Sequence, residues 1–389
     1  MQCRPADGKL RSVTHQLREP FRVGVWGPGT VGTAAIRELI LLPETELRAV
    51  LAYSDDKHGI DAGTLAGTNP IGIPVTTNVE EFMAAGPECV IHAPRDVGDF
   101  RADEDLVLLL ANGINVVTVL PYQYPFTRGD DAIARLDDAA KRGGATLFAT
   151  GINPGFLFER VVLTATGLCN DIQRISLSEY INVEHISGGA EFLTVMGFGM
   201  QATDPATVEA VAGTVSNYLT PYLYYAADQM GLHIERLERD DEHINTSVDI
   251  EIPDLFTLKA GTVARVRFRW IAYADGKPVL STQVNWYATD AMRPEEARGY
   301  GDDVWKIQID GRPSLSLTAE LSGTLAGDAV HPSNPTHPSM LGTAVPAIQA
   351  IGAVIDAPPG VLIVEPPQFH WKRDLRAARS LPATTSSGR

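Results

Sequence analysis

The chain has 389 residues, 44% of them hydrophobic and 21% charged, and its formal net charge is −16. This composition is typical of a globular protein, and the length favours two domains over a single core. The acidic balance argues against a nucleic-acid partner, because a phosphate backbone needs a basic face. No run of apolar residues reaches the roughly 18 that a membrane span needs, so no membrane partner is expected.

The ends of the chain and its cysteines bear on location. Residues 1–20 are polar and lack the apolar stretch of a secretory signal, so they are interpreted as a loose extension. Residues 373–389 are interpreted as a tail that ends in a disordered segment. Cys3, Cys89 and Cys169 are scattered along the chain, which favours reduced thiols in a cytoplasmic protein.

A glycine-rich motif follows the first expected strand. The apolar segment Phe21–Trp26 runs into a G-x-G-x-x-G turn at residues 27–32, and a helical pattern comes directly after it. This order is the context of a dinucleotide site. Gly29 lets the backbone approach a pyrophosphate, and the helix N-terminus offers N–H groups and a partial positive charge. The motif therefore predicts that the chain binds NAD or NADP.

Residues 21–152 alternate expected strands with expected helices. The further strands are expected at residues 47–53, 74–77, 89–93, 115–120 and 145–150, and the clearest helical patterns are at 106–112 and 130–142. Apolar strands separated by helices indicate an α/β fold, in which a doubly wound parallel sheet forms a Rossmann domain. A ligand of such a sheet binds at the carboxyl ends of the strands.

The pattern changes after Gly151. Strands are expected at residues 174–180, 263–273, 279–287 and 314–321, and helices at 156–169 and 205–230. The dipeptide Asp275-Gly276 is a strong hairpin signal. Residues 153–338 are therefore expected to form an α+β domain with a mostly antiparallel sheet, in which 323–338 is a linker or active-site loop. Residues 339–372 are expected to return to the Rossmann domain through a helix.

The end of the second expected strand bears on the choice between NAD and NADP. An acidic residue at this position holds the ribose hydroxyls of NAD. Asp55 fits that role, whereas Ser54, Lys57 and His58 fit a 2′-phosphate equally well. The sequence leaves both cofactors open.

Three segments resemble one enzyme family. Residues 149–156 read ATGINPGF, which is similar to the T-G-x-N-P-G-F segment of the 2,4-diaminopentanoate dehydrogenases and related native amine dehydrogenases. Residues 61–63, and residues 347–352 with the following 357–360, are also similar to segments of these enzymes. The resemblance implies the architecture of dihydrodipicolinate reductase, in which a Rossmann domain precedes an α+β domain that closes over the nicotinamide and forms a homodimer.

The resemblance also implies a reaction. A primary amine, NAD(P)⁺ and water are converted reversibly to a ketone or aldehyde, ammonia and NAD(P)H. The chain departs from the family where Gln349 replaces an asparagine, where Gly352 replaces a proline, and where Tyr53 and Ser54 replace an acidic tip. These departures bear on the contacts to the nicotinamide and to the ribose.

Dihydrodipicolinate reductase activity itself is not expected. Those enzymes carry a pair of histidines followed by K-x-D-A-P-S-G-T. Residues 180–189 of this chain read YINVEHISGG, without a histidine pair, a following lysine or an Asp-Ala-Pro segment.

Reductive amination needs a group that moves protons beside the nicotinamide. One carboxylate can act as general base and acid and can stabilise an iminium cation. Acidic residues gather after the fourth expected strand, at Asp96, Asp99, Asp103, Glu104 and Asp105. By position alone these acids fit a second role equally well, which is to complement the dipole of the following helix. The catalytic glutamate of the family lies at the matching place, so the resemblance implies that Glu104 is the base.

The remaining expected contacts surround this group. The expected cofactor contacts are Gly27, Pro28, Gly29, Thr30, Val31, Gly32, Ser54, Asp55, His58, Ala93, Pro94, Arg95, Asn153 and Gln349. The expected substrate-pocket residues are Phe156, Tyr180, His185 and Met196. No metal site is expected, because His331, His337 and His370 have no ligand spacing and no cysteine near them.

The sequence thus predicts an NAD(P)-dependent amine dehydrogenase for a small, mostly apolar primary amine. One alternative is a reductase of a C=N or C=C bond, similar to dihydrodipicolinate reductase, which would need no ammonia. Another is a redox sensor that binds NAD(P)H without turning over a substrate.

Overall fold

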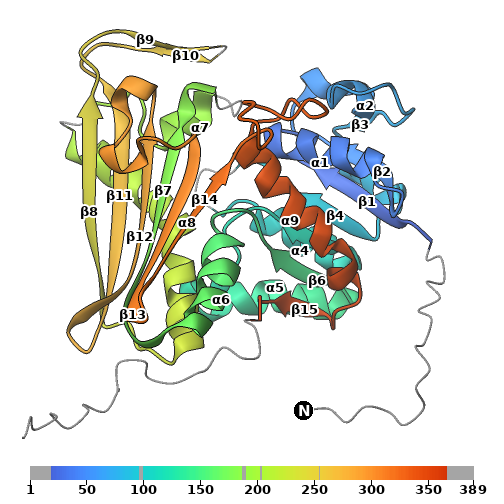
Figure 1. The fold of residues 1–389 in the computed structure, drawn as a ribbon. Coiled ribbons are helices and arrows are strands. Elements are labelled where there is room, and N and C mark those ends of the chain that lie inside the picture. Colours follow the sequence, from blue (N-terminus) through green and yellow to red (C-terminus); the bar gives the residue numbers. More distant parts are fainter. Residues whose placement is uncertain (1–18, 96–99, 186–189, 202–203, 254, 366–389) are drawn as a thin grey trace, which may run out of the picture.

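Two sheets organise the chain. The structure, a computed structural model, describes residues 19–95, 100–185, 190–201, 204–253 and 255–365. Figure 1 shows a parallel sheet with its helices on one side of the molecule and a mixed sheet on the other. The expected tail, residues 373–389, and most of the expected extension lie outside the described residues.

The parallel sheet confirms the expected Rossmann fold. Its strands are β1 (Phe21–Trp26), β2 (Thr45–Leu51), β3 (Val75–Thr76), β4 (Cys89–His92), β5 (Asn115–Thr118), β6 (Thr146–Ala149) and β15 (Gly360–Leu362). They lie in the order β15-β6-β5-β4-β1-β2-β3, and every pair of neighbours is parallel. The strand order reverses between β1 and β4, which is where such sheets bind ligands.

Helices cover both faces of the parallel sheet. One face packs against α1 (Thr30–Leu41) and α9 (Pro338–Ile355), and the other against α4 (Asp103–Ala111) and α5 (Asp130–Gly143). Two short helices, α2 (Ala62–Leu65) and α3 (Val79–Ala84), flank β3. By length and mean hydropathy alone, α9 is long and apolar enough to cross a membrane, although polar residues interrupt it and it is no unbroken apolar run. Its packing against α1 and β5 is that of a helix in the core of a sheet protein.

The second sheet confirms the expected α+β arrangement. Its strands are β7 (Asn170–Asn182), β8 (Arg236–Asn245), β11 (Val263–Ala274), β12 (Lys277–Tyr287), β13 (Asp303–Arg312) and β14 (Leu315–Leu321), in the order β14-β13-β7-β12-β11-β8. Only the β12–β7 pair is parallel among these strands. The expected hairpin joins β11 to β12, where Asp275 and Gly276 have φ of 48° and 70°.

A long helix, α8 (Pro205–Met230), packs on one face of this sheet. Local signals fix its ends, since Asp204 accepts a hydrogen bond from the N–H of Ala206 and Gly231 closes the helix with φ 68°. Along β11, Val266, Phe268 and other alternate residues are buried beneath the helix.

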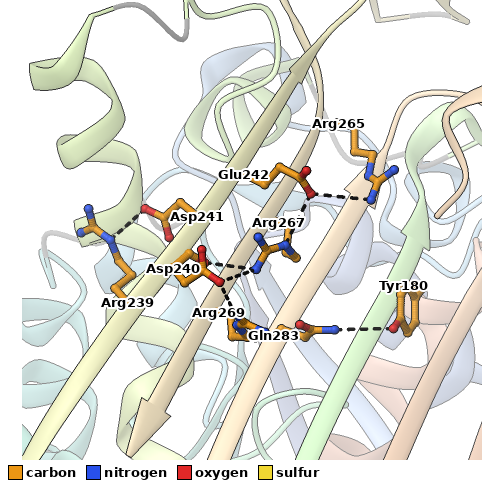
Figure 2. A network of polar contacts seen from close by, with 9 residues as sticks. All are labelled: Tyr180, Arg239, Asp240, Asp241, Glu242, Arg265, Arg267, Arg269 and Gln283. Carbon is orange, nitrogen blue, oxygen red and sulfur yellow. Dashed lines mark hydrogen bonds and ion pairs between the residues drawn. The ribbon is translucent and has the colours of Figure 1, made fainter. Parts of the chain in front are cut away.

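The opposite face of the sheet carries charges that pair across strands. Arg267 and Arg269 of β11 lie opposite Glu242 and Asp240 of β8, and Arg265 also reaches Glu242 (Figure 2). Such cross-strand pairs stabilise a register in which the apolar residues face α8.

Several elements differ from expectation. The segment expected as one helix at 156–169 is broken into a π-helical turn (Leu157–Val162), α6 (Leu163–Ala165) and a 3₁₀ turn (Thr166–Leu168). Strands β8, β13 and β15 were not expected. Neither were α7 (Ala190–Val195) and the separate hairpin of β9 (Ile250–Ile252) and β10 (Phe256–Leu258).

Candidate active site

The glycine-rich loop leads from β1 into α1. Gly27 has φ 90°, and a Cβ on it would lie 2.6 Å from backbone atoms of Pro94. A Cβ on Gly32 would lie 2.2 Å from the carbonyl oxygen of Gly27, so neither position accommodates a side chain. A Cβ on Gly29 would meet no atom within 4 Å. The loop therefore faces open space at the start of α1, where a pyrophosphate can approach the backbone.

A cavity of about 540 Å³ extends from this loop to the second sheet, and we call it the central cavity. The parallel sheet and its loops line it with Gly29, Thr30, Val31, Lys57, Ala93, Pro94, Arg95, Val119, Leu120, Gly151, Ile152, Asn153 and Pro154. The second sheet and the helices line it with Glu179, Ile181, Val195, Met196, Thr214, Val215, Tyr218, Leu219, Val284, Trp286, Trp305, Ser339, Met340 and Thr343. The cavity therefore joins the expected cofactor loop to a mostly apolar wall.

Glu179 places a carboxylate in this wall. It lies in β7 and is 4% exposed. Its Oε1 accepts a hydrogen bond from the indole Nε1 of Trp286 at 2.7 Å. Its Oε2 accepts from Nε1 of Trp305 at 2.7 Å and from Nδ2 of Asn153 at 2.8 Å. Burial raises the pKa of Glu179, and these three donors act in the opposite direction.

The carboxyl group of Glu179 has hydrogen-bond donors but no basic side chain as a partner in the described part of the chain. Within the described residues, no lysine, arginine or histidine forms an ion pair with Glu179. When the carboxyl group of Glu179 is ionised, the neutral donors stabilise the anion but leave its negative charge at the cavity surface. An ionised group that is buried in this way favours the approach of a cation, because pairing offsets the cost of burial. The wall is thus suited to bind an ammonium group.

A second buried acid, Asp303, lies on the same side of the sheet, since β13 pairs with β7. Its Oδ2 is 3.5 Å from Nδ1 of His337, and the same nitrogen is 2.9 Å from the hydroxyl of Ser339. Burial, followed by the charges of Asp302 and Glu179, raises the pKa of Asp303 to about 8. The surroundings of Asp303 therefore favour its neutral form.

The structure places Glu104 outside the described lining of the central cavity, and its role as the base stays a prediction. Glu104 lies in the first turn of α4 with its side chain 74% exposed. Its Oε2 forms an ion pair with Arg135 of α5 at 2.6 Å. The neighbouring Asp103 pairs with Arg128 at 2.5 Å. These acids lie at the start of α4, where they complement the helix dipole, and Asp96 and Asp99 lie outside the described residues.

The expected substrate-pocket residues separate into different environments. Met196 lines the central cavity. Tyr180 does not, because side chains alternate along β7 and its phenol points to the outer face of the sheet, next to Gln283 (Figure 2). Phe156 is 41% exposed and lies outside the cavity lining. The side chain of His185 lies outside the described part of the structure.

Most of the expected cofactor contacts lie at or directly behind the central cavity. Those that line it are Gly29, Thr30, Val31, Ala93, Pro94, Arg95 and Asn153, and those in the loop behind it are Gly27, Pro28 and Gly32. Gln349 of α9 does not line the described cavity, and its expected cofactor contact stays a prediction. It is exposed in the second half of the helix, whereas Ser339, Met340 and Thr343 near the start of α9 line the cavity.

Of the residues after β2, some line the central cavity and others do not. Ser54 and Asp55 are exposed and are not part of the cavity lining. His58 is turned toward Thr77, whose hydroxyl lies 3.3 Å from its Nδ1. Lys57, at the end of the 3₁₀ turn Asp55–Lys57, is the residue of this segment that lines the central cavity.

Sequence reasoning missed Glu179 and its two tryptophans. A signal was present, because Glu179 lies between Leu177 and Ile181 in an alternating strand, at a position that faces inward. An acid at an inward position is rare unless it is paired or functional. Trp286 and Trp305 belong to other strands, and only the pairing of β7 with β12 and β13 brings their indoles to Glu179.

Comparison with known sequences identifies relatives over most of the chain. Residues 156–367, more than half of the chain, match the 2,4-diaminopentanoate dehydrogenase C-terminal domain. A protein of Streptomyces virginiae named amine dehydrogenase is 26% identical over 304 residues, which cover 76% of this chain and 84% of that protein. A protein of Acetoanaerobium sticklandii named 2,4-diaminopentanoate dehydrogenase is 24% identical over 265 residues, which cover 67% and 68%.

Solved structures share the fold. An amine dehydrogenase from Mycobacterium smegmatis aligns over 90% of this chain and 96% of its own, with a TM-score of 0.71 and 22% identity. The protein GenD2 from gentamicin A biosynthesis, solved in complex with NAD, aligns over 87% of both chains, with a TM-score of 0.52 and 16% identity.

Proposed function

Because this chain belongs to the 2,4-diaminopentanoate dehydrogenase family, we propose that it is an NAD(P)-dependent amine dehydrogenase. It interconverts a small primary amine with the corresponding ketone or aldehyde and ammonia. The names of two relatives, an amine dehydrogenase and a 2,4-diaminopentanoate dehydrogenase, support an oxidoreductase that acts on amines. The observation that carries the proposal is the buried carboxylate of Glu179, which faces the same cavity as the glycine-rich loop.

The loop residues fit a nicotinamide dinucleotide. Gly27 and Gly32 permit the tight turn, and the open space above Gly29 at the start of α1 suits the pyrophosphate. Val119 and Asn153, at the ends of β5 and β6, line the cavity between the loop and the second sheet. The bound nicotinamide would accept the hydrogen that leaves the amine-bearing carbon together with its electron pair.

Glu179 is the proposed base. Its carboxylate would bind the substrate ammonium and accept one of its protons, which frees the nitrogen lone pair to form a C=N bond. The same charge then stabilises the positively charged iminium group. After Glu179 has passed its proton to water, it can take a proton from the water molecule that attacks the iminium carbon, which gives a carbinolamine. Glu179 then returns this proton to the nitrogen, the C–N bond breaks to release ammonia, and the carboxylate takes the hydroxyl proton as the carbonyl group forms. In the reverse direction, Glu179 keeps ammonia neutral for attack on the carbonyl carbon.

The surroundings of Glu179 set the substrate class. Next to it, the wall is formed by apolar side chains such as Ile181, Val215, Leu219 and Val284. Within the described residues, the part of the wall formed by the second sheet, α7 and α8 contains no other charged side chain. A substrate with its own carboxylate would have no cation to pair with at this end. A small apolar monoamine fits the wall.

We also propose a cytoplasmic homodimer. On the outer face of the second sheet, Arg265, Arg267 and Arg269 of β11 pair with acids of β8 and stay partly exposed (Figure 2), and a second copy of the chain would bury them. Cys89 and Cys169 are buried and free, as expected in a reducing compartment. Light scattering on the purified protein tests the dimer, and a monomeric mass would contradict it.

The function is tested by following NADPH and NADH absorbance with short ketones and aldehydes, with and without ammonia. We expect oxidation that requires both the carbonyl compound and ammonia. Glu179→Gln keeps the size of the side chain and should lower this rate by at least about 100-fold, the usual contribution of a general base. Cofactor fluorescence should show that the variant still binds NAD(P)H.

The other outcomes would overturn parts of the proposal. Oxidation that does not need ammonia would indicate a reductase of a C=O, C=N or C=C bond. Bound cofactor without turnover of any carbonyl compound would indicate a redox sensor. A comparison with Glu104→Gln separates the two acids, because loss of activity in that variant alone would return the role of base to Glu104.

A further inference from the structure

We propose that Lys57 recognises the 2′-phosphate of NADP(H) and makes this enzyme prefer NADP(H) over NAD(H). The inference rests on the proposed use of a nicotinamide dinucleotide and adds the identity of the cofactor. It is carried by the position of one cation between the glycine-rich loop and the end of β2.

The side chain of Lys57 reaches back over the loop. Its Nζ donates a hydrogen bond to the carbonyl oxygen of Pro28 at 2.8 Å. Pro28 lies between Gly27 and Gly29, so the ammonium group is held against the turn that approaches the dinucleotide. Lys57 is half-buried and lines the central cavity together with Gly29 and Thr30. A positive charge and the loop therefore border the same space.

The end of β2 is the part of a dinucleotide fold that faces the adenosine ribose. NAD is held there by an acidic side chain, and NADP by a cation. The pyrophosphate, in contrast, lies at the N-terminus of α1. Lys57 belongs to the segment after β2. We therefore assign its ammonium group to the adenosine ribose rather than to the pyrophosphate.

Two other residues of this segment, Tyr53 and Asp55, do not line the cavity. The phenol oxygen of Tyr53 accepts a hydrogen bond from Nε1 of Trp26 at 2.7 Å and donates one to Asp105 of α4. Tyr53 is thereby tied to the helix that follows β4. Asp55 is exposed and absent from the described cavity lining. Lys57 is thus the charged group of this segment that a ligand in the cavity would meet.

The test uses ligands that need neither an amine nor a redox step. Isothermal titration of the full-length protein compares 5′-AMP, 2′,5′-ADP and 3′,5′-ADP. The last two carry the same added charge at different positions of the ribose. We expect 2′,5′-ADP to bind about 10- to 100-fold more tightly than 5′-AMP. This ratio of affinities is the contribution expected from one hydrogen bond to a charged group. We also expect 2′,5′-ADP to bind more tightly than 3′,5′-ADP, and the advantage to shrink as salt is raised.

Variants assign the preference to Lys57. Lys57→Met should remove the advantage of 2′,5′-ADP while retaining the affinity for 5′-AMP, and Lys57→Arg should preserve the advantage. Lys141→Met changes the charge equally at an exposed site on α5 and should bind like the wild type. NADPH fluorescence titrations against NADH should show the same order with the complete cofactors.

Three results would overturn the inference. One is equal binding of the two bisphosphates by the wild type. Another is an equal loss of all three ligands in Lys57→Met, which would place the lysine on the 5′-phosphate side. The third is a preference for 5′-AMP that Asp55→Asn abolishes, because an acidic residue would then hold the ribose. The proposed amine dehydrogenase function is tested separately. If the protein prefers 2′,5′-ADP but turns over no amine, the role of Lys57 stands and the proposed function is refuted.

Discussion

Glu159 should make the stability of the fold depend on pH. It is 1% exposed in the π-helical turn Leu157–Val162. Its Oε2 accepts a hydrogen bond from the backbone N–H of Gly155 at 3.0 Å, and Oε1 has no hydrogen-bond partner among the described atoms. Burial is the largest influence and raises the pKa of Glu159 from 4.5 to about 7. The folded chain therefore favours the neutral form of this side chain.

The sign and size of the effect follow from proton binding. Between about pH 4.5 and about pH 7, the folded state holds the proton of Glu159 and the unfolded state does not. Its contribution to the free energy of unfolding is therefore complete below the unfolded pKa and is lost as the pH rises through the folded pKa. A pKa raised from 4.5 to about 7 corresponds to about 3 kcal/mol, at about 1.4 kcal/mol per pH unit.

Urea unfolding of the wild type and Glu159→Gln at about pH 5 and about pH 8 measures this contribution. Glutamine preserves the shape and the acceptor for Gly155 but does not titrate. Because a pH of about 5 already lies above the unfolded pKa, we expect the free energy of unfolding of the wild type to fall by about 2.5 kcal/mol more than that of the variant between the two conditions. Other buried acids, such as Asp303, titrate in both proteins and cancel in the difference. The same dependence on pH in wild type and variant would refute the reasoning.

Two further predictions concern the site. Trp305→Phe removes one donor to Glu179, so the acid limb of the pH profile of kcat/KM for deamination should move up by about one pH unit. Trp270→Phe, a buried tryptophan of β11 outside the cavity lining, should leave that limb in place, and equal movement in both variants would contradict the assignment. Gly32→Ala should lower the melting temperature, because its Cβ would lie 2.2 Å from a carbonyl oxygen. Gly29→Ala should keep the melting temperature but weaken NAD(P)H binding, and a normal Kd would argue against pyrophosphate contact at this loop.

The parallel sheet could be predicted because its signals are local. Apart from β15, each strand is a short apolar run between helical patterns, and the glycine-rich turn marks the first crossing from strand to helix. The ends of α8 were equally readable, since Pro205 and Gly231 mark the start and the end of a long helical pattern. These features depend on neighbours in the sequence rather than on tertiary contacts.

The missed features depend on contacts between distant segments. The sequence of β8 is mostly charged, and it forms a strand because Asp240 and Glu242 pair with arginines of β11. The sequence does not show which strands pair, so the predicted base was Glu104, an acid next to an expected helix start. Glu104 has that position, but Glu179 has the burial and the donors, which come from β12 and β13. The alternation of β7 marks Glu179 as an inward-facing position, but no pattern within a single segment identifies its donors.

The return of the chain to its first sheet has a consequence for synthesis on the ribosome. β15 forms one edge of the parallel sheet, although β1, the first strand in the chain, lies inside that sheet. α9 packs against α1. α9 also supplies Ser339, Met340 and Thr343 to the central cavity. All strands of the second sheet leave the ribosome earlier and can pair first. We therefore expect a nascent chain to hold an incomplete cavity, and to capture no cofactor, until α9 and β15 have left the ribosome.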